Sequence, residues 1–116
     1  MTRRDDTVRL RHMLEHSREA VRIAGGRSRE ELARDRLLQL ALTRLVEVIG
    51  EAASQVSSEG KDKWSHVPWQ EAISTRNRLI HGYDVLDINI LWDTVTVDLP
   101  PLIETLERIL ESGEGG

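Results

Sequence analysis

Residues 28–56 read SREELARDRLLQLALTRLVEVIGEAASQV, and this stretch decides the fold. Apolar residues recur through it every three or four positions, which is the period of an α-helix that buries one face. The apolar stripe comprises Leu38, Leu42, Leu45, Ile49, Ala52 and Val56. The opening Ser28-Arg29-Glu30-Glu31 has the form of a capping box, in which a serine hydroxyl bonds the backbone at the start of a helix. We therefore expect one long helix from Ser28 to Val56, and we expect it to be the spine of the fold.

A second apolar line runs along the same predicted helix. It comprises Leu37, Leu40, Ala41 and Val48. A helix that is apolar over more than one face contacts several neighbouring helices or a second subunit. Gly50 lies inside the helix, where glycine costs about 1 kcal/mol relative to alanine. A close helix crossing or a dimer contact is the expected reason for this glycine.

Two further helices are predicted on either side of the spine. The first covers residues 6–24 and ends at Gly25-Gly26, because glycine is the usual residue just beyond a helix. The polar residues 57–67 are expected to form the main loop. The third helix covers residues 68–82, with Pro68 as its first residue, a position that needs no backbone N–H.

The last predicted helix begins after Asp87, whose side chain suits an N-cap. Its apolar period continues through Pro100-Pro101, so a kink is expected there rather than a break. Residues 1–116 suit a single domain with its own core. The sequence therefore predicts an all-α fold, an up-and-down bundle of four helices with a kinked C-terminal helix.

Composition narrows the class of protein. The chain has 116 residues, no cysteine and a net charge of −4. Thiolate chemistry and disulfides are excluded, and general affinity for nucleic acid is disfavoured. Charge is uneven, however, since residues 1–44 hold 11 arginines against 7 acids. We expect a soluble, cytoplasmic protein with no membrane segment, whose basic surface lies in its first half and near Arg76 and Arg78.

The stretch RNRLIHGY at residues 76–83 carries most of the functional information. It contains Arg76, His81 five positions later, and Tyr83, the only tyrosine in the chain. The bare R-x4-H spacing is weak, since about half a match is expected by chance. A second match, Arg11 to His16, has Arg18 where the tyrosine would be. The added tyrosine distinguishes the stretch at 76–83.

This R-x4-H-x-Y motif resembles that of the HEPN superfamily, and more narrowly of its HepT-like ribonuclease toxins. The flanking segments VPWQEAI at 67–73, EVIGEAA at 47–53 and DLP at 98–100 extend the resemblance over roughly residues 30–110. The resemblance implies a homodimeric, metal-independent endoribonuclease that needs no cofactor, with Arg76 and His81 as catalytic residues. It also implies an antitoxin partner, a minimal nucleotidyltransferase of the MntA type, which transfers AMP to Tyr83.

The residues themselves leave several roles open. Arg76 falls on the apolar stripe of its helix, where it either serves a site or pairs structurally with Glu47 or Glu51. Arg76 and His81 lie about 140° apart around an ideal helix. To share one target, the helix end must loosen or a second subunit must complete the site. Asn77 and Arg78 are supporting candidates, since both lie within one turn of His81.

Competing interpretations also remain at this point. A histidine near a helix C-terminus is often a simple cap. The chain could instead be a non-catalytic helical partner that binds nucleotide and regulates a nucleotidyltransferase, or a purely structural bundle. His12 and His16 are spaced as metal ligands, but no third ligand is evident, so no metal site is predicted. Trp64, Trp69 and Trp92 could stack bases, yet Trp69 and Trp92 lie near apolar stripes and suit a core.

Overall fold

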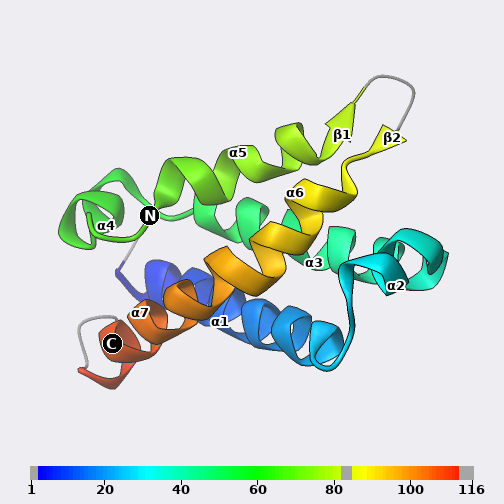
Figure 1. The fold of residues 1–116 in the computed structure, drawn as a ribbon. Helices are drawn as coiled ribbons and strands as arrows, with labels where there is room; N and C mark the ends of the chain where they lie inside the picture. Colours follow the sequence, from blue (N-terminus) through cyan, green and yellow to red (C-terminus); the bar gives the residue numbers. More distant parts are fainter. Residues whose placement is uncertain (1–2, 82–84, 113–116) are drawn as a thin grey trace.

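The structure of the chain is a computed structural model that describes residues 3–81 and 85–112. Helices make up nearly all of this part, and two short strands form a hairpin at one end (Figure 1). The elements in chain order are α1 Arg3–Ala24, α2 Arg29–Arg34, α3 Arg36–Ser54, α4 Ser58–Lys63, α5 Trp69–Leu79, β1 Ile80–His81, β2 Val85–Leu86, α6 Ile88–Asp93, the π-helix η1 Thr94–Asp98, and α7 Leu99–Glu111. The predicted helical class is confirmed, with the hairpin as an addition. No helix in the described ranges is long and apolar enough to cross a membrane.

Helix α3 is the spine that the sequence predicts. It packs against α1 on one side and α5 on the other, while α7 packs against α1 (Figure 1). The predicted stripe of α3 is buried, apart from Leu45, which is half-buried. Trp64 and Trp69 are also buried, and the Trp69 ring N–H donates to the Trp64 carbonyl at 3.1 Å. Trp92 is half-buried against the same core.

The single helix expected over residues 28–56 is divided in two at Asp35. This residue adopts an extended conformation, and its carboxylate accepts a hydrogen bond from the Leu38 N–H at 3.0 Å. A short acidic side chain can take over backbone donors in this way and start a new helix. The predicted cap at Ser28 is confirmed, since its hydroxyl accepts from the Glu31 N–H at 3.1 Å.

The predicted loop at residues 57–67 contains the short helix α4. Asp6 of α1, which is only 4% exposed, accepts hydrogen bonds from the Ser57 backbone N–H at 2.8 Å and from the Ser57 hydroxyl. The same hydroxyl accepts from the Gly60 N–H at 3.0 Å. A Cβ at Gly60 would lie 2.6 Å from an Asp6 carboxylate oxygen. A contact with a distant helix therefore stabilises α4, and local spacing does not reveal it.

The C-terminal helix continues through Pro100-Pro101, as predicted. Its cap at Asp87 is confirmed, because the side chain accepts from the Ile90 N–H at 3.0 Å. The irregularity is a π-helical turn, η1, that ends two residues before Pro100. Each proline lacks an N–H and its ring crowds the carbonyl four residues earlier, which in both cases belongs to η1. The wider π turn gives those carbonyls room.

Helix α5 ends at Leu79, which corrects the expected helix over residues 68–82. The next two residues form β1 and pair antiparallel with β2, so that Ile80 faces Leu86 and His81 faces Val85. The Asp87 N–H also donates to the Leu79 carbonyl at 2.7 Å and closes the base of the hairpin. Cross-strand bonding here replaces the last helical turn. Gly82, the predicted helix end, lies outside the described residues.

Candidate functional site

Arg76 faces the two glutamates that the sequence offers as its partners. It is exposed, and it lines a cavity of about 50 Å³ between α3 and α5 together with Glu47 and Glu51. Ser54, Ile73 and Gly50 complete the wall. Among the described residues Arg76 forms no ion pair, and Glu51 instead lies 3.5 Å from Arg44. The structure thus places Glu47, Glu51 and Arg76 around one cavity, and no ion pair within the described residues fixes the guanidinium.

Gly50 explains how α3 and α5 come so close. A Cβ at this position would lie 2.8 Å from the Ala72 carbonyl oxygen, which is backbone and cannot turn aside. The close helix crossing expected from this glycine is confirmed. Because the two backbones touch here, Glu47 and Glu51, which flank Gly50 on α3, are held beside Arg76.

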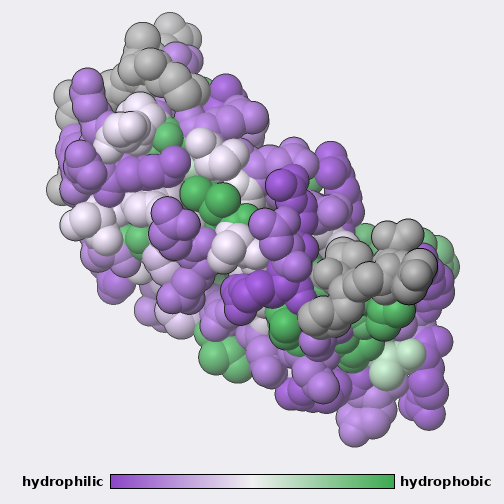
Figure 2. Space-filling model, turned by 90° about the horizontal axis from the view of Figure 1, so that it is seen from above, coloured by the Kyte–Doolittle hydropathy of each residue, from purple (hydrophilic) through white to green (hydrophobic). Residues whose placement is uncertain are grey.

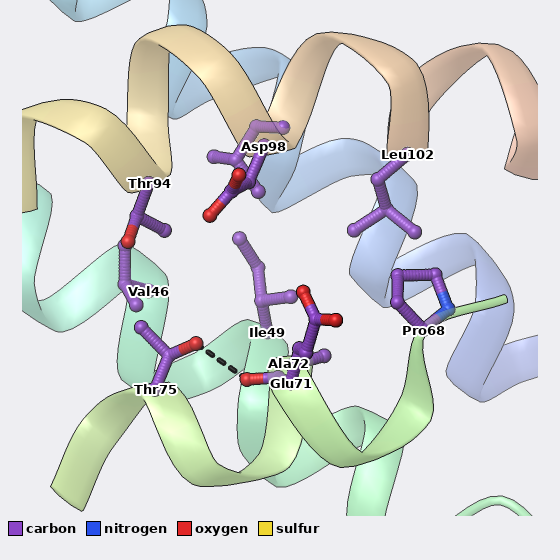
Figure 3. A pocket seen from close by; sticks show the side chains of 10 residues that line it. Val46, Ile49, Pro68, Glu71, Ala72, Thr75, Thr94, Asp98 and Leu102 are labelled. Atoms are coloured by element: carbon purple, nitrogen blue, oxygen red, sulfur yellow. Dashed lines mark hydrogen bonds between the residues drawn. The ribbon is translucent and has the colours of Figure 1, made fainter. Parts of the chain in front are cut away.

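Asn77 and Arg78 are both exposed, but Arg78 turns toward a different side of α5. One of its guanidinium N–H groups donates to the Thr75 hydroxyl at 2.9 Å. Thr75 in turn donates to the Glu71 carbonyl, and it lines a second cavity (Figure 3). Arg76 therefore lines the first cavity, while Arg78 bonds Thr75 at the edge of the second, whereas the sequence suggested one shared positive field.

His81 lies on β1 rather than on the helix that carries Arg76. The angle of about 140° that an ideal helix would place between the two residues therefore does not apply. Of the two arrangements expected from the sequence, loosening of the helix end is present in the backbone. The side chain of His81, and the whole of Tyr83, lie outside the described residues.

A second cavity, of about 40 Å³, contains a pair of carboxyl groups (Figure 3). Glu71 comes from α5 and Asp98 from η1, and both side chains point toward the space between the helices. The volume has room for a few water molecules. Burial raises the pKa of Asp98, Glu71 and Asp93 raise it further, and the Arg78 guanidinium opposes them.

We expect Asp98→Asn to stabilise the fold near neutral pH. The pKa of Asp98 is raised above its ordinary value of 3.8, so the folded chain holds this proton more tightly than the unfolded chain. The stability that protonated Asp98 contributes is therefore fully present at pH values below its ordinary pKa, and it is lost as the pH rises through the pKa of the folded state. The variant should gain in free energy of unfolding near pH 7 and gain little near pH 3, where Asp98 is protonated in both states.

Urea denaturation at the two pH values measures this gain. The control is Glu104→Gln, which removes a carboxylate at an exposed position of α7. A gain in free energy of unfolding that is equal at both pH values, or that also appears in Glu104→Gln, would contradict the raised pKa of Asp98.

A larger cleft, of about 360 Å³, lies between α3 and the hairpin. Its walls comprise Arg36, Gln39, Leu40, Thr43, Arg44, Glu47 and Leu86. Sequence reasoning did not single out Arg44, although it stands three residues before Glu47 and seven before Glu51. That spacing places all three on one face of a helix, and it is the signal that could have found Arg44.

The two histidines of α1, His12 and His16, interact with each other. The His16 ring Nδ1 donates to the His12 carbonyl at 2.7 Å, and the two ring centroids lie 6.3 Å apart. Across residues 3–81 and 85–112, no three metal-ligating side chains gather in one place.

Comparison with known proteins identifies the family. A family model described as "Ribonuclease HepT-like" matches residues 13–109. The chain belongs to the HepT-like ribonuclease family. This match confirms the resemblance drawn from the motifs, and it begins in α1, further toward the N-terminus than the motifs reach. Arg76, His81, Tyr83 and the three cavities described above all lie within the part matched by the HepT-like model.

Similar proteins carry ribonuclease names. The chain is 33% identical over 102 residues to "Putative RNase TTE0752" of Caldanaerobacter subterraneus subsp. tengcongensis, covering 88% of this chain and 91% of the relative. It is 35% identical over 80 residues to "Probable ribonuclease HepT" of Thermococcus cleftensis, covering 69% and 73%. It is 29% identical over 115 residues to "Putative RNase MJ1216" of Methanocaldococcus jannaschii, covering 99% and 95%. No solved structure gives a significant match.

Proposed function

We propose that this chain is the toxin of a toxin–antitoxin pair, and that it is an endoribonuclease that cleaves RNA without a metal ion. The main support is that the chain belongs to the HepT-like ribonuclease family. The chain also contains the Arg76-x4-His81 motif, whose residue types suit RNA cleavage. The position of Arg76 at a cavity, with His81 in the hairpin that follows its helix, supports a site at this end of the molecule.

The reaction needs only groups that RNA and these two residues possess. The 2′-oxygen of the substrate attacks the adjacent phosphorus, and the bond from phosphorus to the 5′-oxygen of the next nucleotide breaks. The 2′-hydroxyl proton passes to a base, and the leaving 5′-oxygen gains a proton. The products are a 2′,3′-cyclic phosphate and a 5′-hydroxyl. No metal ion is required for this proton balance.

His81 and Arg76 divide this work by their chemistry. An imidazole exchanges protons near neutral pH, so His81 serves as the acid–base group. A guanidinium stays charged and offers a planar fork of donors, so Arg76 stabilises the negative charge on the phosphorane oxygens. Asn77, exposed beside Arg76, either orients the His81 ring or bonds a phosphate oxygen. Glu47 and Glu51 line the same cavity as Arg76 and form no ion pair with it among the described residues, which leaves the guanidinium available to a phosphate.

The proposed enzyme is a homodimer, and its site lies at the cleft between the two copies. Support comes from apolar side chains that the single chain leaves exposed, with Leu37 at 79%, Leu40 at 50% and Val85 at 59%. Figure 2 shows hydrophobic patches within a mostly hydrophilic face of the molecule. Apolar surface of this kind marks an interface more often than scattered exposure does. Burial between two copies would place two Arg76–His81 pairs near one another.

Tyr83 is the proposed off-switch. The partner, a minimal nucleotidyltransferase of the MntA type, transfers AMP to its hydroxyl and thereby silences the toxin. Added phosphates two residues from His81 would compete with RNA for Arg76. The support for this role is the family motif, because Tyr83 is the only tyrosine of the chain and stands two residues after the histidine.

Incubation of the purified chain with single-stranded RNA in excess EDTA tests the proposed activity. We expect cleavage, with 2′,3′-cyclic phosphate ends that mass spectrometry detects. RNA that stays intact would overturn the ribonuclease and favour a non-catalytic partner of a nucleotidyltransferase. For the switch, ATP and the nucleotidyltransferase should silence the parent chain, whereas Tyr83→Phe should remain active and gain no AMP.

A further inference from the structure

The cavity beside Arg76 and the larger cleft between α3 and the hairpin are neighbouring parts of one trough. Glu47 lines both of them. The far wall of the cleft is Leu86, which is the cross-strand neighbour of Ile80 in the hairpin. The cleft thus runs from Glu47, at the edge of the Arg76 cavity, to Leu86 on β2, the strand that pairs with the one carrying His81. An RNA strand bound in the cleft would therefore lie beside the Arg76 cavity.

The side chains along this trough are ordered by charge. Arg36, Leu40, Arg44, Glu47 and Glu51 follow one another at intervals of three or four residues, and therefore share one face of α3. The acids stand beside Arg76, and the two arginines stand along the cleft. Arg36 and Arg44 are separated by eight residues, or about 12 Å along the helix. Two cations at this spacing, on a chain of net charge −4, suit a ligand with repeated negative charges.

The arginine nearest the active site is held weakly. The side chain of Arg44 is 65% exposed and that of Glu51 is 46% exposed, with 3.5 Å between their charged atoms. Exposed pairs of this kind contribute little to stability, so the exchange of Glu51 for a phosphate costs little. The guanidinium fork also matches phosphate oxygens in geometry. Arg44 is therefore free to change partner.

The remaining walls of the cleft suit a nucleotide. The volume of about 360 Å³ lies within the range of small-molecule sites. Leu86 supplies apolar surface for a base, and Thr43 supplies a hydroxyl. Gln39 is fixed by donating its amide to the Leu32 carbonyl at 2.9 Å, which leaves its side-chain oxygen as an acceptor. A purely apolar partner surface would offer no opposite charge to Arg36 or Arg44.

We propose that this trough binds the RNA strand beside the cleaved bond, and that Arg44 and Arg36 are positioning residues that neutralise its neighbouring phosphates. The inference rests on the proposed ribonuclease activity and extends it to the path of the substrate. These residues hold the strand and do not touch the reacting atoms.

Binding of a fluorescein-labelled single-stranded RNA, measured over a range of salt concentrations, tests the proposal. His81→Ala serves as the background, so that the RNA is not cut. Each phosphate neutralised on a single strand adds about 0.7 to the slope of log affinity against log salt. Arg44→Gln should therefore lower the slope by about 0.7 and weaken binding about fivefold near 0.1 M salt. Arg36→Gln combined with it should lower the slope by about 1.4.

The matched control is Arg11→Gln, which removes an exposed arginine of α1 outside the trough. It should leave the slope unchanged, and circular dichroism confirms that every variant is folded. In the active chain, Arg44→Gln should raise KM for RNA more than it lowers kcat, as expected of a group that binds the strand.

Two outcomes would overturn the proposed path of the RNA strand. An unchanged salt slope in the double variant would mean that the trough does not hold the strand. A change of oligomeric state in Arg44→Gln without a change of slope would assign the trough to a protein interface. Either result can occur while the parent chain still cleaves RNA, so failure of this inference is separable from failure of the proposed function.

Discussion

Replacement of His81 by alanine is expected to lower the rate of RNA cleavage by a factor of about 10² to 10⁴, the usual contribution of a positioned acid–base group. The loss should appear mainly in kcat, because the ring acts on protons in the transition state and adds little to strand binding. Single-turnover cleavage of a labelled RNA measures it.

Arg76 provides the second half of the same test. Arg76→Ala should cost about 10² to 10³ in kcat, the range for loss of one donor to a developing oxyanion. Arg76→Lys keeps the charge but loses the planar fork, so it should recover only part of that activity.

The chain supplies its own matched control for both variants. Arg11 and His16 have the same R-x4-H spacing on α1, and both are described in a regular helix with no tyrosine two positions later. His16→Ala and Arg11→Gln should therefore leave cleavage unchanged. If His81→Ala cleaves as fast as the parent, or if His16→Ala is equally damaging, the assignment of the site is wrong.

Gly50→Val is expected to cost about 3 kcal/mol or more in free energy of unfolding. A Cβ at this position already lies 2.8 Å from the Ala72 carbonyl oxygen, and valine adds two further carbons to a contact that consists of backbone. For a chain of this size each 1 kcal/mol corresponds to about 4 °C or more in Tm. Thermal and urea denaturation measure the loss. Gly50→Ala should show a smaller one, partly offset by the better helix propensity of alanine.

Ser54→Val is the matched control for this crossing. It places the same β-branched residue one turn further along α3 at an exposed position. The change lowers helix propensity and removes the exposed hydrogen bond from the Ser54 hydroxyl to the Glu51 carbonyl at 2.7 Å, which together should cost about 1 kcal/mol. Equal loss in Ser54→Val and Gly50→Val would show that propensity, and not the contact with Ala72, makes glycine necessary.

The parts of the fold that were predicted correctly are those that depend on burial along a regular helix. The stripe of α3 and the apolar period of the C-terminal helix recur at helical spacing because each helix buries one face, and the core contains nearly all of their members. The parts missed depend on other interactions. Asp35 caps a new helix and so divides the predicted long one, and Asp6 of α1 stabilises α4 by hydrogen bonding to Ser57. Cross-strand pairing ends α5 at Leu79.

The candidate site also has features that helical spacing predicts and features that it cannot predict. Spacing alone placed Glu47 and Glu51 on one face of α3, and Gly50 indicated the close approach that brings them to Arg76. Spacing could not show that Arg78 turns to Thr75, because that choice depends on the cavity between α5 and η1. It also could not show that Arg44 borders the same trough as Arg76, since Leu86, which forms the other wall, fell in the connection between two predicted helices and no hairpin was expected there.

The π-helical turn η1 has a consequence for how the length of this chain can vary. Leu91, Val95 and Leu99 are buried at intervals of four, slightly wider than the α-helical period, and η1 absorbs the difference. A π turn holds one residue more than an α turn, so the loss of one residue from η1 would restore an ordinary α-helix while α6 and α7 keep their rotational phase. Leu91 would stay in the core, and the hairpin joined to α6 would stay beside α3. The cost would fall on Pro100 and Pro101, whose rings would then crowd the carbonyls four residues earlier. The extra residue of η1 thus accommodates the two prolines and does not set the direction of the hairpin.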